Sequence, residues 1–392
     1  MTKSPQNNQL RITFAIAFMI ALRMYGLFLI LPVFSVYAQD ISGSTPFLMG
    51  LAIGVYGLTQ AFLQIPMGFL SDIWGRKNVI ALGLSLFLIG SVIAALATDI
   101  TTIIIGRAVQ GMGAIAATGM ALIADVSKPE QRSKMMAIVG VGIGFSFMLA
   151  FITGPLLASM YGLSGLFWMT AILAGMALVV LVFMVHEPEK RIERDYRFIE
   201  VLQSIREKQL LLLDMGVFAI HASMSALFLV LPVVLVNYFD WPVTNHWQLY
   251  LPVMVASLFI MIPLIFWQEK RKNHVRLMLL TFLLLAINFL LLQLGLKTWL
   301  VIVLSLTVYF GLFNYLEASM PALLSKIATE KYRGAAMGAY STAQFMGAFV
   351  GGAVGGYLMS YSVNLVLLAL FALLLFLALV GFVVFGGQRS VS

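Results

Sequence analysis

Five ionisable side chains fall inside long apolar stretches of the chain. They are Arg23, Arg107, Asp214, His221 and Glu317. A charge at the depth of a lipid bilayer costs at least about 2.5–3.5 kcal/mol unless it is paired, so such residues usually mark a pathway for ions or substrates. Carboxyl and imidazole groups can exchange protons there. Guanidinium groups stay charged, and they can bind a substrate or support a proton-exchanging neighbour.

Glu317 is the first candidate for a group that gains and loses a proton. Apolar surroundings favour the protonated carboxyl and a nearby cation favours the carboxylate, so a glutamate under both influences can change state. His221 is the second candidate, because imidazole titrates near neutral pH without help. Asp214 completes the set, near one end of the apolar run that holds His221.

Structural roles remain open for each of these groups. Glu317 could pair with Lys326 or with a backbone group, and His221 could hydrogen-bond to a neighbouring helix. Arg23 and Arg107 could brace helices instead of binding a substrate or supporting proton exchange.

The amino-acid composition indicates which class of protein carries these side chains. Of the 392 residues, 61% are hydrophobic and only 10% are charged, whereas about 25% are charged in a typical soluble domain. So few charges cannot cover a soluble surface, which excludes a cytosolic enzyme, a secreted disulfide module and a disordered chain. The sequence therefore predicts an all-α membrane protein with many spans.

Several kinds of site are excluded by residues that the sequence lacks. There is no cysteine, hence no disulfide, thiolate metal site or cysteine nucleophile. No phosphate-binding loop of the Gly-x4-Gly-Lys-Ser/Thr type occurs, which argues against ATP as the energy source. The four histidines are dispersed without metal-ligand spacing. We expect no enzymatic activity, no metal and no cofactor, with a proton gradient as the energy source.

The apolar runs predict twelve transmembrane helices, since a helix needs about 20 apolar residues to cross a bilayer. The predicted spans are 12–37, 47–70, 78–97, 102–124, 134–158, 163–185, 210–236, 247–268, 277–296, 299–323, 334–359 and 363–386.

The basic residues predict the orientation of these spans. Of the 24 Lys and Arg residues, 21 fall on one side, Lys297 alone falls on the other, and Arg23 and Arg107 lie within spans. Basic residues concentrate on the cytoplasmic side, so both termini are expected in the cytoplasm. The net charge of +8 then reflects topology and contact with anionic lipid, and nucleic-acid binding is not expected. The cytoplasmic set is Lys3, Arg11, Arg76, Lys77, Lys128, Arg132, Lys134, Lys190, Arg191, Arg194, Arg197, Arg206, Lys208, Lys270, Arg271, Lys272, Arg276, Lys326, Lys331, Arg333 and Arg389.

An internal repeat at a shift of about 200 residues divides the chain. Residues 27–33 read LFLILPV and residues 227–233 read LFLVLPV, and two further matches follow in order. The repeat predicts two pseudo-symmetric six-helix bundles joined by a charged, amphipathic cytoplasmic linker. Parallel repeats of this kind place a substrate site at the midplane between them. The predicted domains are 1–188, 189–209 and 210–392.

The turn between the second and third spans carries a compact polar motif, GFLSDIWGRK at residues 68–77. Gly68 and Gly75 allow a tight turn and a close backbone approach. Asp72 can cap the positive N-terminus of a neighbouring helix, a contribution of about 0.3–1 kcal/mol. Arg76 can pair with Asp125 at the cytoplasmic end of the fourth span.

In these residues the chain resembles the Major Facilitator Superfamily. The motif matches the family's signature for this loop, except that Ile73 stands at a usually basic position. Residues 107–117 look like the family's second motif, and Gly154-Pro155 looks like the core of its antiporter motif. The resemblance is closest to the drug:proton antiporter branch. Within that branch, residues 52–61 and 337–342 are similar to the bacterial YajR-like transporters.

The resemblance implies a conformational latch on the cytoplasmic side. It implies that Asp72 caps the helix that begins near Gly334, which would join the two halves and stabilise an outward-open state. The simpler alternative is a turn with positive-inside charges. The latch set is Gly68, Asp72, Gly75, Arg76, Lys77, Asp125 and Arg132.

The resemblance also implies that the first, fourth, seventh and tenth spans line a central cavity. Aromatic and methionine side chains adapt to varied apolar ligands, which favours a hydrophobic or amphipathic substrate. The candidate lining residues are Arg23, Tyr25, Phe28, Tyr56, Gln60, Gln64, Arg107, Met112, Met224, Tyr309, Phe313, Asn314, Tyr340 and Gln344.

Together these features predict a secondary active transporter in a bacterial inner membrane. We expect proton-coupled export of hydrophobic or amphipathic small molecules by alternating access. Two alternatives stay open, which are a proton-symporting or facilitative importer of a small metabolite and a transport-inactive sensor or assembly partner. The expected partners are an unidentified small-molecule substrate and membrane lipid, and the expected state is a monomer.

Overall fold

The computed structural model describes residues 5–126, 132–185, 207–271, 274–328 and 333–385. Helices make up nearly all of these ranges, and the β-structure within them is limited to one isolated bridge between Ser42 and Asp99. Most of the predicted linker, residues 189–206, lies outside the described residues, as does the side chain of Arg132. The contacts divide the chain into two compact units, and each unit is described by itself.

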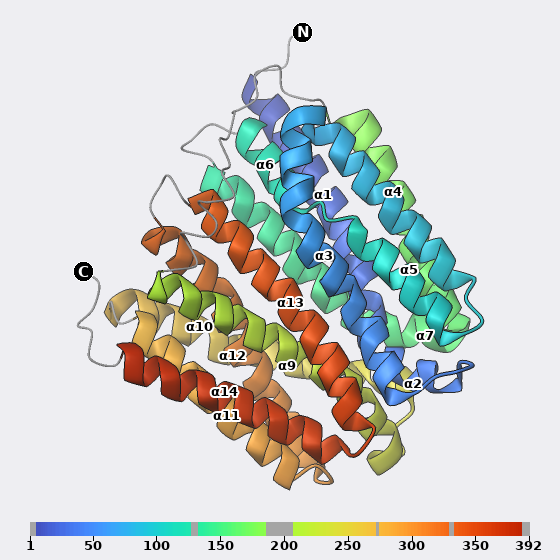
Figure 1. Cartoon of the computed structure of the whole chain (residues 1–392), viewed down its shortest axis with the longest axis vertical. Helices are drawn as coiled ribbons and strands as arrows, with labels where there is room; N and C mark the ends of the chain where they lie inside the picture. Colours follow the sequence, from blue (N-terminus) through green and yellow to red (C-terminus); the bar gives the residue numbers. More distant parts are fainter. Residues whose placement is uncertain (1–4, 127–131, 186–206, 272–273, 329–332, 386–392) are drawn as a thin grey trace. The chain divides into compact units, whose positions relative to one another are not determined.

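The first unit contains residues 1–44 and 51–196. Within it, α1 packs along α7, while α4 packs against both α5 and α7 (Figure 1). Hydrogen bonds from the hydroxyl and the backbone N–H of Thr102 lower the pKa of Asp99, which caps the start of α5. The elements are α1 (Pro5–Ile30), α2 (Phe34–Tyr37), η1 (Ala38–Asp40), α3 (Pro46–Trp74), α4 (Arg76–Ala95), α5 (Ile100–Met112), α6 (Ala116–Val126) and α7 (Arg132–Met184).

The second unit contains residues 197–392 together with residues 45–50, the start of α3. Its most buried element is α9, which packs against α12, α13 and α14. The α11 helix lies beside α14 (Figure 1). The elements are α9 (Lys208–Phe239), η3 (Val243–Asn245), α10 (Trp247–Arg271), α11 (His274–Leu294), α12 (Trp299–Ile327), α13 (Arg333–Met359) and α14 (Val363–Phe385).

The predicted spans fall largely on helical residues, with three departures from continuous single helices. The predicted span 12–37 is interrupted at residues 31–33, between the end of α1 at Ile30 and the start of α2 at Phe34. The predicted span 102–124 is broken at residues 113–115, where Gly113 leaves the helical conformation and α5 gives way to α6. The predicted spans 134–158 and 163–185 fall within one assigned helix, α7. At Gly162 that helix has φ 65° and ψ −172°, a left-handed region that glycine enters readily and where the chain can turn.

Length and composition identify nine helices within the described ranges that could cross a membrane. The sequence predicts twelve crossings, and the difference has physical causes. The α7 helix counts once although its 53 residues would extend about 80 Å at 1.5 Å per residue. The break at residues 113–115 shortens α5 and α6, and the glycines of α13 lower its hydropathy. The count of twelve stays a prediction.

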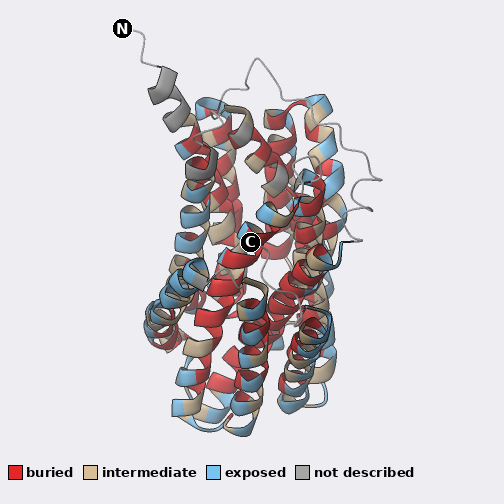
Figure 2. Cartoon of the chain, turned by 90° about the vertical axis from the view of Figure 1, so that its left-hand side faces the viewer, coloured by how far each residue is buried: buried red, intermediate tan, exposed pale blue. Residues whose placement is uncertain are grey.

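Burial alternates around most of the helices, whereas α9 is buried along nearly its whole length (Figure 2). In the first unit, Ile16, Ile80, Leu122, Val139 and Leu181 form part of one buried cluster contributed by α1, α4, α6 and α7. Large apolar side chains such as Phe62, Phe183 and Phe259 are exposed instead. An apolar exterior of this kind is suited to contact with lipid.

Candidate functional site: a histidine, glutamate and glutamine network

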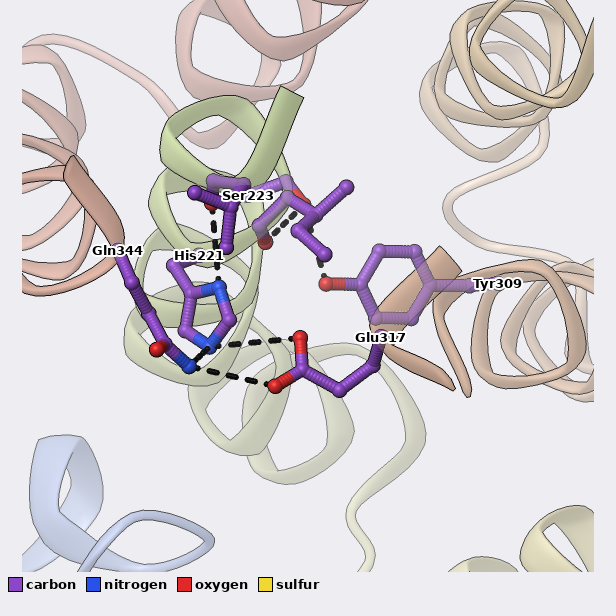
Figure 3. Close-up of polar contacts among 7 residues, drawn as sticks. His221, Ser223, Tyr309, Glu317 and Gln344 are labelled. Atoms are coloured by element: carbon purple, nitrogen blue, oxygen red, sulfur yellow. Dashed lines mark hydrogen bonds and ion pairs between the residues drawn. The ribbon is translucent and has the colours of Figure 1, made fainter. Parts of the chain in front are cut away.

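Three helices of the second unit bring His221, Glu317 and Gln344 together (Figure 3). Gln344 Nε2 on α13 lies 2.8 Å from His221 Nε2 on α9 and 3.2 Å from Glu317 Oε1 on α12. The second carboxylate oxygen, Oε2, lies 3.8 Å from His221 Nε2. The sequence predicts proton exchange at both ionisable members, and the structure adds an amide group between them.

Donor and acceptor chemistry assigns the protons in this arrangement. His221 Nδ1 lies 3.1 Å from the backbone oxygen of Val217, which can only accept, so Nδ1 carries a proton. The Nε2 atom of a neutral ring is then an acceptor, and it receives a hydrogen bond from the Gln344 amide. The other N–H of the same amide donates to Glu317 Oε1. An imidazole with its proton on Nδ1 and the Oε1 atom of Glu317 therefore accept the two amide protons of Gln344.

One added proton makes this arrangement untenable. Protonation of His221 at Nε2 sets an N–H against the N–H of Gln344, and two donors cannot bond to each other. The new donor can turn to Glu317 Oε2, which is buried and has no hydrogen-bond partner among the described residues, and it can transfer its proton there to give the carboxylic acid. Alternatively, the amide of Gln344 can rotate and present its oxygen. Protonation therefore selects between two hydrogen-bond patterns that involve three helices.

Aromatic and polar neighbours surround the network. The Tyr309 hydroxyl lies 3.1 Å from Ser223 Oγ (Figure 3). The ring of Phe313 packs between Tyr309 and His221, with centroid distances of 5.8 and 5.7 Å. These rings hold the imidazole in an apolar setting, where electrostatic interactions are stronger than in water.

A second acidic group lies on the same helix as His221. Asp214 precedes it by seven residues, which is about two helical turns and about 10 Å. Asp214 Oδ1 is buried without a hydrogen-bond partner among the described residues, and so is the hydroxyl of Tyr340. Tyr340 lies within electrostatic reach of both Asp214 and Glu317. One turn of α13 separates Tyr340 from Gln344, so the two side chains share a face.

Glycines set the spacing between α9 and α13. A Cβ added to Gly347 would lie 2.2 Å from the backbone oxygen of Phe218, and one added to Gly351 would lie 2.1 Å from that of Ala222. Only glycine permits such an approach. These contacts flank His221 on α9, so they fix the distance across which Gln344 reaches the imidazole.

Replacing Gly351 with alanine should therefore disturb both packing and the network. We expect Gly351→Ala to lower the free energy of unfolding by about 1–3 kcal/mol, the usual cost of an overpacked contact. Thermal unfolding in detergent measures this change. The matched control is Gly140→Ala in α7, where an added Cβ meets nothing within 4 Å. Equal stabilities of the two variants would show that the α9–α13 contact is loose.

Two buried arginines occupy the first unit. Arg23 on α1 donates from one terminal nitrogen to the Tyr56 hydroxyl at 2.8 Å and to the Gly113 backbone oxygen at 2.9 Å. Arg107 on α5 donates to the backbone oxygen of Ala52 at 3.2 Å and to Gln110 Oε1 at 2.8 Å. The break after α5 thus frees a carbonyl that Arg23 binds.

The turn between α3 and α4 contains a buried ion pair. Arg76 Nε donates to Asp125 Oδ2 at 3.0 Å, as the sequence indicates, and Arg76 also pairs with Asp72 and bonds to Ser71. The turn at Gly75 has φ 101°, a conformation that favours glycine. The predicted cap of the helix near Gly334 involves the other unit and stays a prediction.

The remaining latch and motif residues are placed as follows. Lys77 donates to the backbone oxygen of Val182, and a Cβ added to Gly68 would meet nothing within 4 Å. Gly154 lies where a Cβ would approach the Leu29 backbone oxygen to 2.7 Å, so it allows α1 and α7 to pack closely, and Pro155 lies within α7.

Sequence comparison now adds to this geometry. The profile of the Major Facilitator Superfamily matches residues 16–316, more than half of the chain. The chain belongs to the Major Facilitator Superfamily. It is 38% identical over 341 residues to the inner membrane transport protein YajR of Escherichia coli, covering 86% of this chain and 75% of YajR. The chain is thus a YajR-like transporter of the superfamily, and not an enzyme.

Two further comparisons concern a shorter match and the fold. The quinolone resistance protein NorA of Staphylococcus aureus is 28% identical over 189 residues, or 48% of each chain. The crystal structure of a bacterial homologue of the human lysosomal transporter Spinster, inward-facing and occupied, superposes with a TM-score of 0.80. The two sequences are 14% identical, and the superposition covers 98% of this chain and 97% of the Spinster homologue. This likeness shows the superfamily fold.

The predicted lining residues of this superfamily member divide between the two units. Those in the first unit are Arg23, Tyr25, Phe28, Tyr56, Gln60, Gln64, Arg107 and Met112, and those in the second are Met224, Tyr309, Phe313, Asn314, Tyr340 and Gln344. The structure adds a second role for Gln344, which joins the candidate proton site.

Sequence reasoning missed three polar residues that complete these networks. Ser223 bonds to Tyr309, and Gln110 links Arg107 to Ser91. Their only signal in the sequence is a polar side chain within an apolar run.

Proposed function

We propose that this protein is a proton-coupled antiporter that exports hydrophobic or amphipathic small molecules. The observation that carries the proposal is the partly buried network of His221, Gln344 and Glu317 in a superfamily transporter. A proton-coupled transporter needs a group whose protonation favours one of its two conformations over the other. This network can supply such a group, because it has two hydrogen-bond patterns that differ by one proton. The name of NorA, a resistance protein, supports export.

The proposed cycle uses the three helices that carry the network. With Glu317 charged and His221 neutral, Gln344 holds α9, α12 and α13 together through two hydrogen bonds. Protonation releases this arrangement and favours the alternative access state. Substrate binding and protonation alternate, so the downhill movement of protons drives the export of substrate.

Asp214 and Tyr340 provide the proposed exit for the proton on the cytoplasmic side. Asp214 lies near the start of α9, the end that the positive-inside prediction places in the cytoplasm. Tyr340 lies within electrostatic reach of both Asp214 and Glu317, and its hydroxyl can donate and accept. A proton can therefore pass from Glu317 toward the inner end by way of these two groups and intervening water.

The proposal includes the predicted membrane arrangement. We propose twelve membrane crossings and a bacterial inner-membrane location with both termini in the cytoplasm. The proposed domains are 1–188 and 210–392, joined by a linker at 189–209. The rings of Trp241 and Trp299 lie 4.2 Å apart between centroids and are tilted by 36°, and Lys297 Nζ lies 5.4 Å from the centre of the Tyr238 ring. Such aromatic residues gather at membrane interfaces, which supports an outer interface at this end of α9.

Four further expectations belong to the same proposal. The protein works as a monomer, needs no cofactor and binds no nucleic acid. The latch at Asp72 and Arg76 sets the balance between the outward-open and inward-open states. A proton-coupled or facilitative importer is the alternative with the same fold.

Flux in vesicles separates export by antiport from import. We choose three probes that share a naphthalene body, namely naphthalenesulfonate, naphthylmethyl-trimethylammonium and naphthylmethanol. In proteoliposomes with an acidic lumen and a clamped membrane potential, antiport should concentrate a transported probe in the lumen. Symport would move the probe toward the alkaline side, and facilitated diffusion would only equilibrate it. No protein-dependent movement of any probe would contradict the proposal.

A further inference from the structure

The interior of the first unit holds two positive charges that have no negative partner among the described residues. Arg23 is 1% exposed and Arg107 is 3% exposed. Each guanidinium faces an aromatic ring, with Arg23 Cζ 5.2 Å from the centre of Phe87 and Arg107 Cζ 4.9 Å from the centre of Tyr56. Their hydrogen-bond partners are the neutral oxygens of Tyr56, Gly113, Ala52 and Gln110.

The carboxylates described in this unit do not neutralise the charges of Arg23 and Arg107. Within the part of the first unit that the structure describes, the carboxylates are Asp40, Asp72, Asp99 and Asp125. Each of these lies in a turn or near a helix end, and two of them pair with Arg76. The α6 helix also begins three residues after the carbonyl that Arg23 binds, and its N-terminus adds positive potential.

Unpartnered polar atoms lie on the helices around the arginines. Both amide atoms of Gln60, Oε1 of Gln64, Oγ1 of Thr118 and Nε of Arg23 are buried without a hydrogen-bond partner among the described residues. Gln60 and Gln64 follow Tyr56 at successive turns of α3, so the three share a face. Buried polar atoms normally have partners, and this group lacks several.

We propose that Arg23, Arg107 and Gln60 form a binding site for the anionic group of an amphipathic substrate. This inference rests on the proposed function and names its substrate class. A sulfonate or carboxylate would replace the neutral oxygens on Arg23 with charge-assisted hydrogen bonds, which are roughly twice as strong. Its remaining oxygens would receive the Gln60 amide protons, and the rings of Phe87 and Tyr56 would contact the apolar body.

Equilibrium binding of the three naphthalene probes tests this site directly. The protein is placed in lipid nanodiscs at one pH, without a gradient, and probe binding is measured by dialysis against empty nanodiscs. Naphthalenesulfonate should bind, while naphthylmethyl-trimethylammonium and naphthylmethanol should not. Because the unaltered protein is used, this comparison does not depend on the folding of any variant.

Variants then locate the binding. Arg107→Gln and Arg23→Gln should each weaken naphthalenesulfonate binding by about ten- to a hundredfold, the effect of losing a charged hydrogen-bond partner. Lys297→Gln removes one positive charge from an end of the second unit and should bind as the unaltered protein does. Gln60→Leu keeps both charges and should reduce binding, because the amide donates to the anion.

The outcomes separate the site from the transport proposal. If all three probes bind equally, the arginines only brace the helices. The same conclusion follows if naphthalenesulfonate still binds after both arginine substitutions. Movement of the ammonium probe by a pH gradient, without sulfonate binding, would overturn the substrate class and leave the transport proposal intact. Glu269→Gln should bind naphthalenesulfonate normally, because Glu269 lies exposed near the end of α10 in the other unit.

Discussion

Glu317→Gln should abolish gradient-driven accumulation of a transported probe. A one-to-one exchange with protons can sustain about a tenfold concentration ratio per pH unit, since each tenfold ratio is worth about 1.4 kcal/mol. The glutamine side chain preserves size and can still meet Gln344, but it cannot release a proton. The accumulation ratio should therefore fall to one, while exchange of labelled for unlabelled probe without a gradient continues.

The control for this experiment is another glutamate changed in the same way. Glu269 lies exposed near the end of α10, so Glu269→Gln alters the same chemistry away from the network. It should accumulate probe as the unaltered protein does. Persistent accumulation by Glu317→Gln would remove Glu317 from the coupling mechanism, and loss of exchange as well would point to damaged folding or substrate binding.

Arg76→Gln should produce the largest loss of stability. Arg76 is 2% exposed and the side chain of Asp125 is fully buried. Removal of the guanidinium leaves a buried carboxylate without its countercharge, which costs about 3–5 kcal/mol. The free energy of unfolding, from denaturant titration in mixed micelles, measures the loss.

A second substitution shows whether the charge is the cause. Asp125→Asn combined with Arg76→Gln removes both charges and should recover most of the lost stability. If Arg76→Gln alone changes the free energy of unfolding by less than about 1 kcal/mol, the ion pair contributes no more than an exposed one does. That result would contradict the buried setting of this turn.

Much of the helical architecture follows from the sequence because each crossing requires a long apolar run. The ion pair of Arg76 and Asp125 is also foreseeable, because a charged turn at a membrane edge offers few partners. The break at residues 113–115 is not foreseeable, since the apolar run continues through it. The freed carbonyl oxygen of Gly113 accepts a hydrogen bond from Arg23, which is remote in the sequence.

The candidate proton site is only partly foreseeable for the same reason. His221 and Glu317 stand out because ionisable residues are rare in apolar runs. Gln344 does not stand out, since an uncharged polar residue in a helix has many ordinary roles. Its position between the other two depends on Gly347 and Gly351, which let α13 approach α9 closely. Helix spacing of this kind is a tertiary property that periodicity does not encode.

Infrared difference spectroscopy tests most directly whether the network of His221, Gln344 and Glu317 exchanges a proton. The protein is held in lipid without substrate, and spectra at high and low pH are subtracted. Acidification should produce a carboxylic acid band that is missing in Glu317→Gln and shifted in Gln344→Leu, because Gln344 donates a hydrogen bond to Glu317. Identical difference spectra for all three proteins would contradict proton exchange at this network.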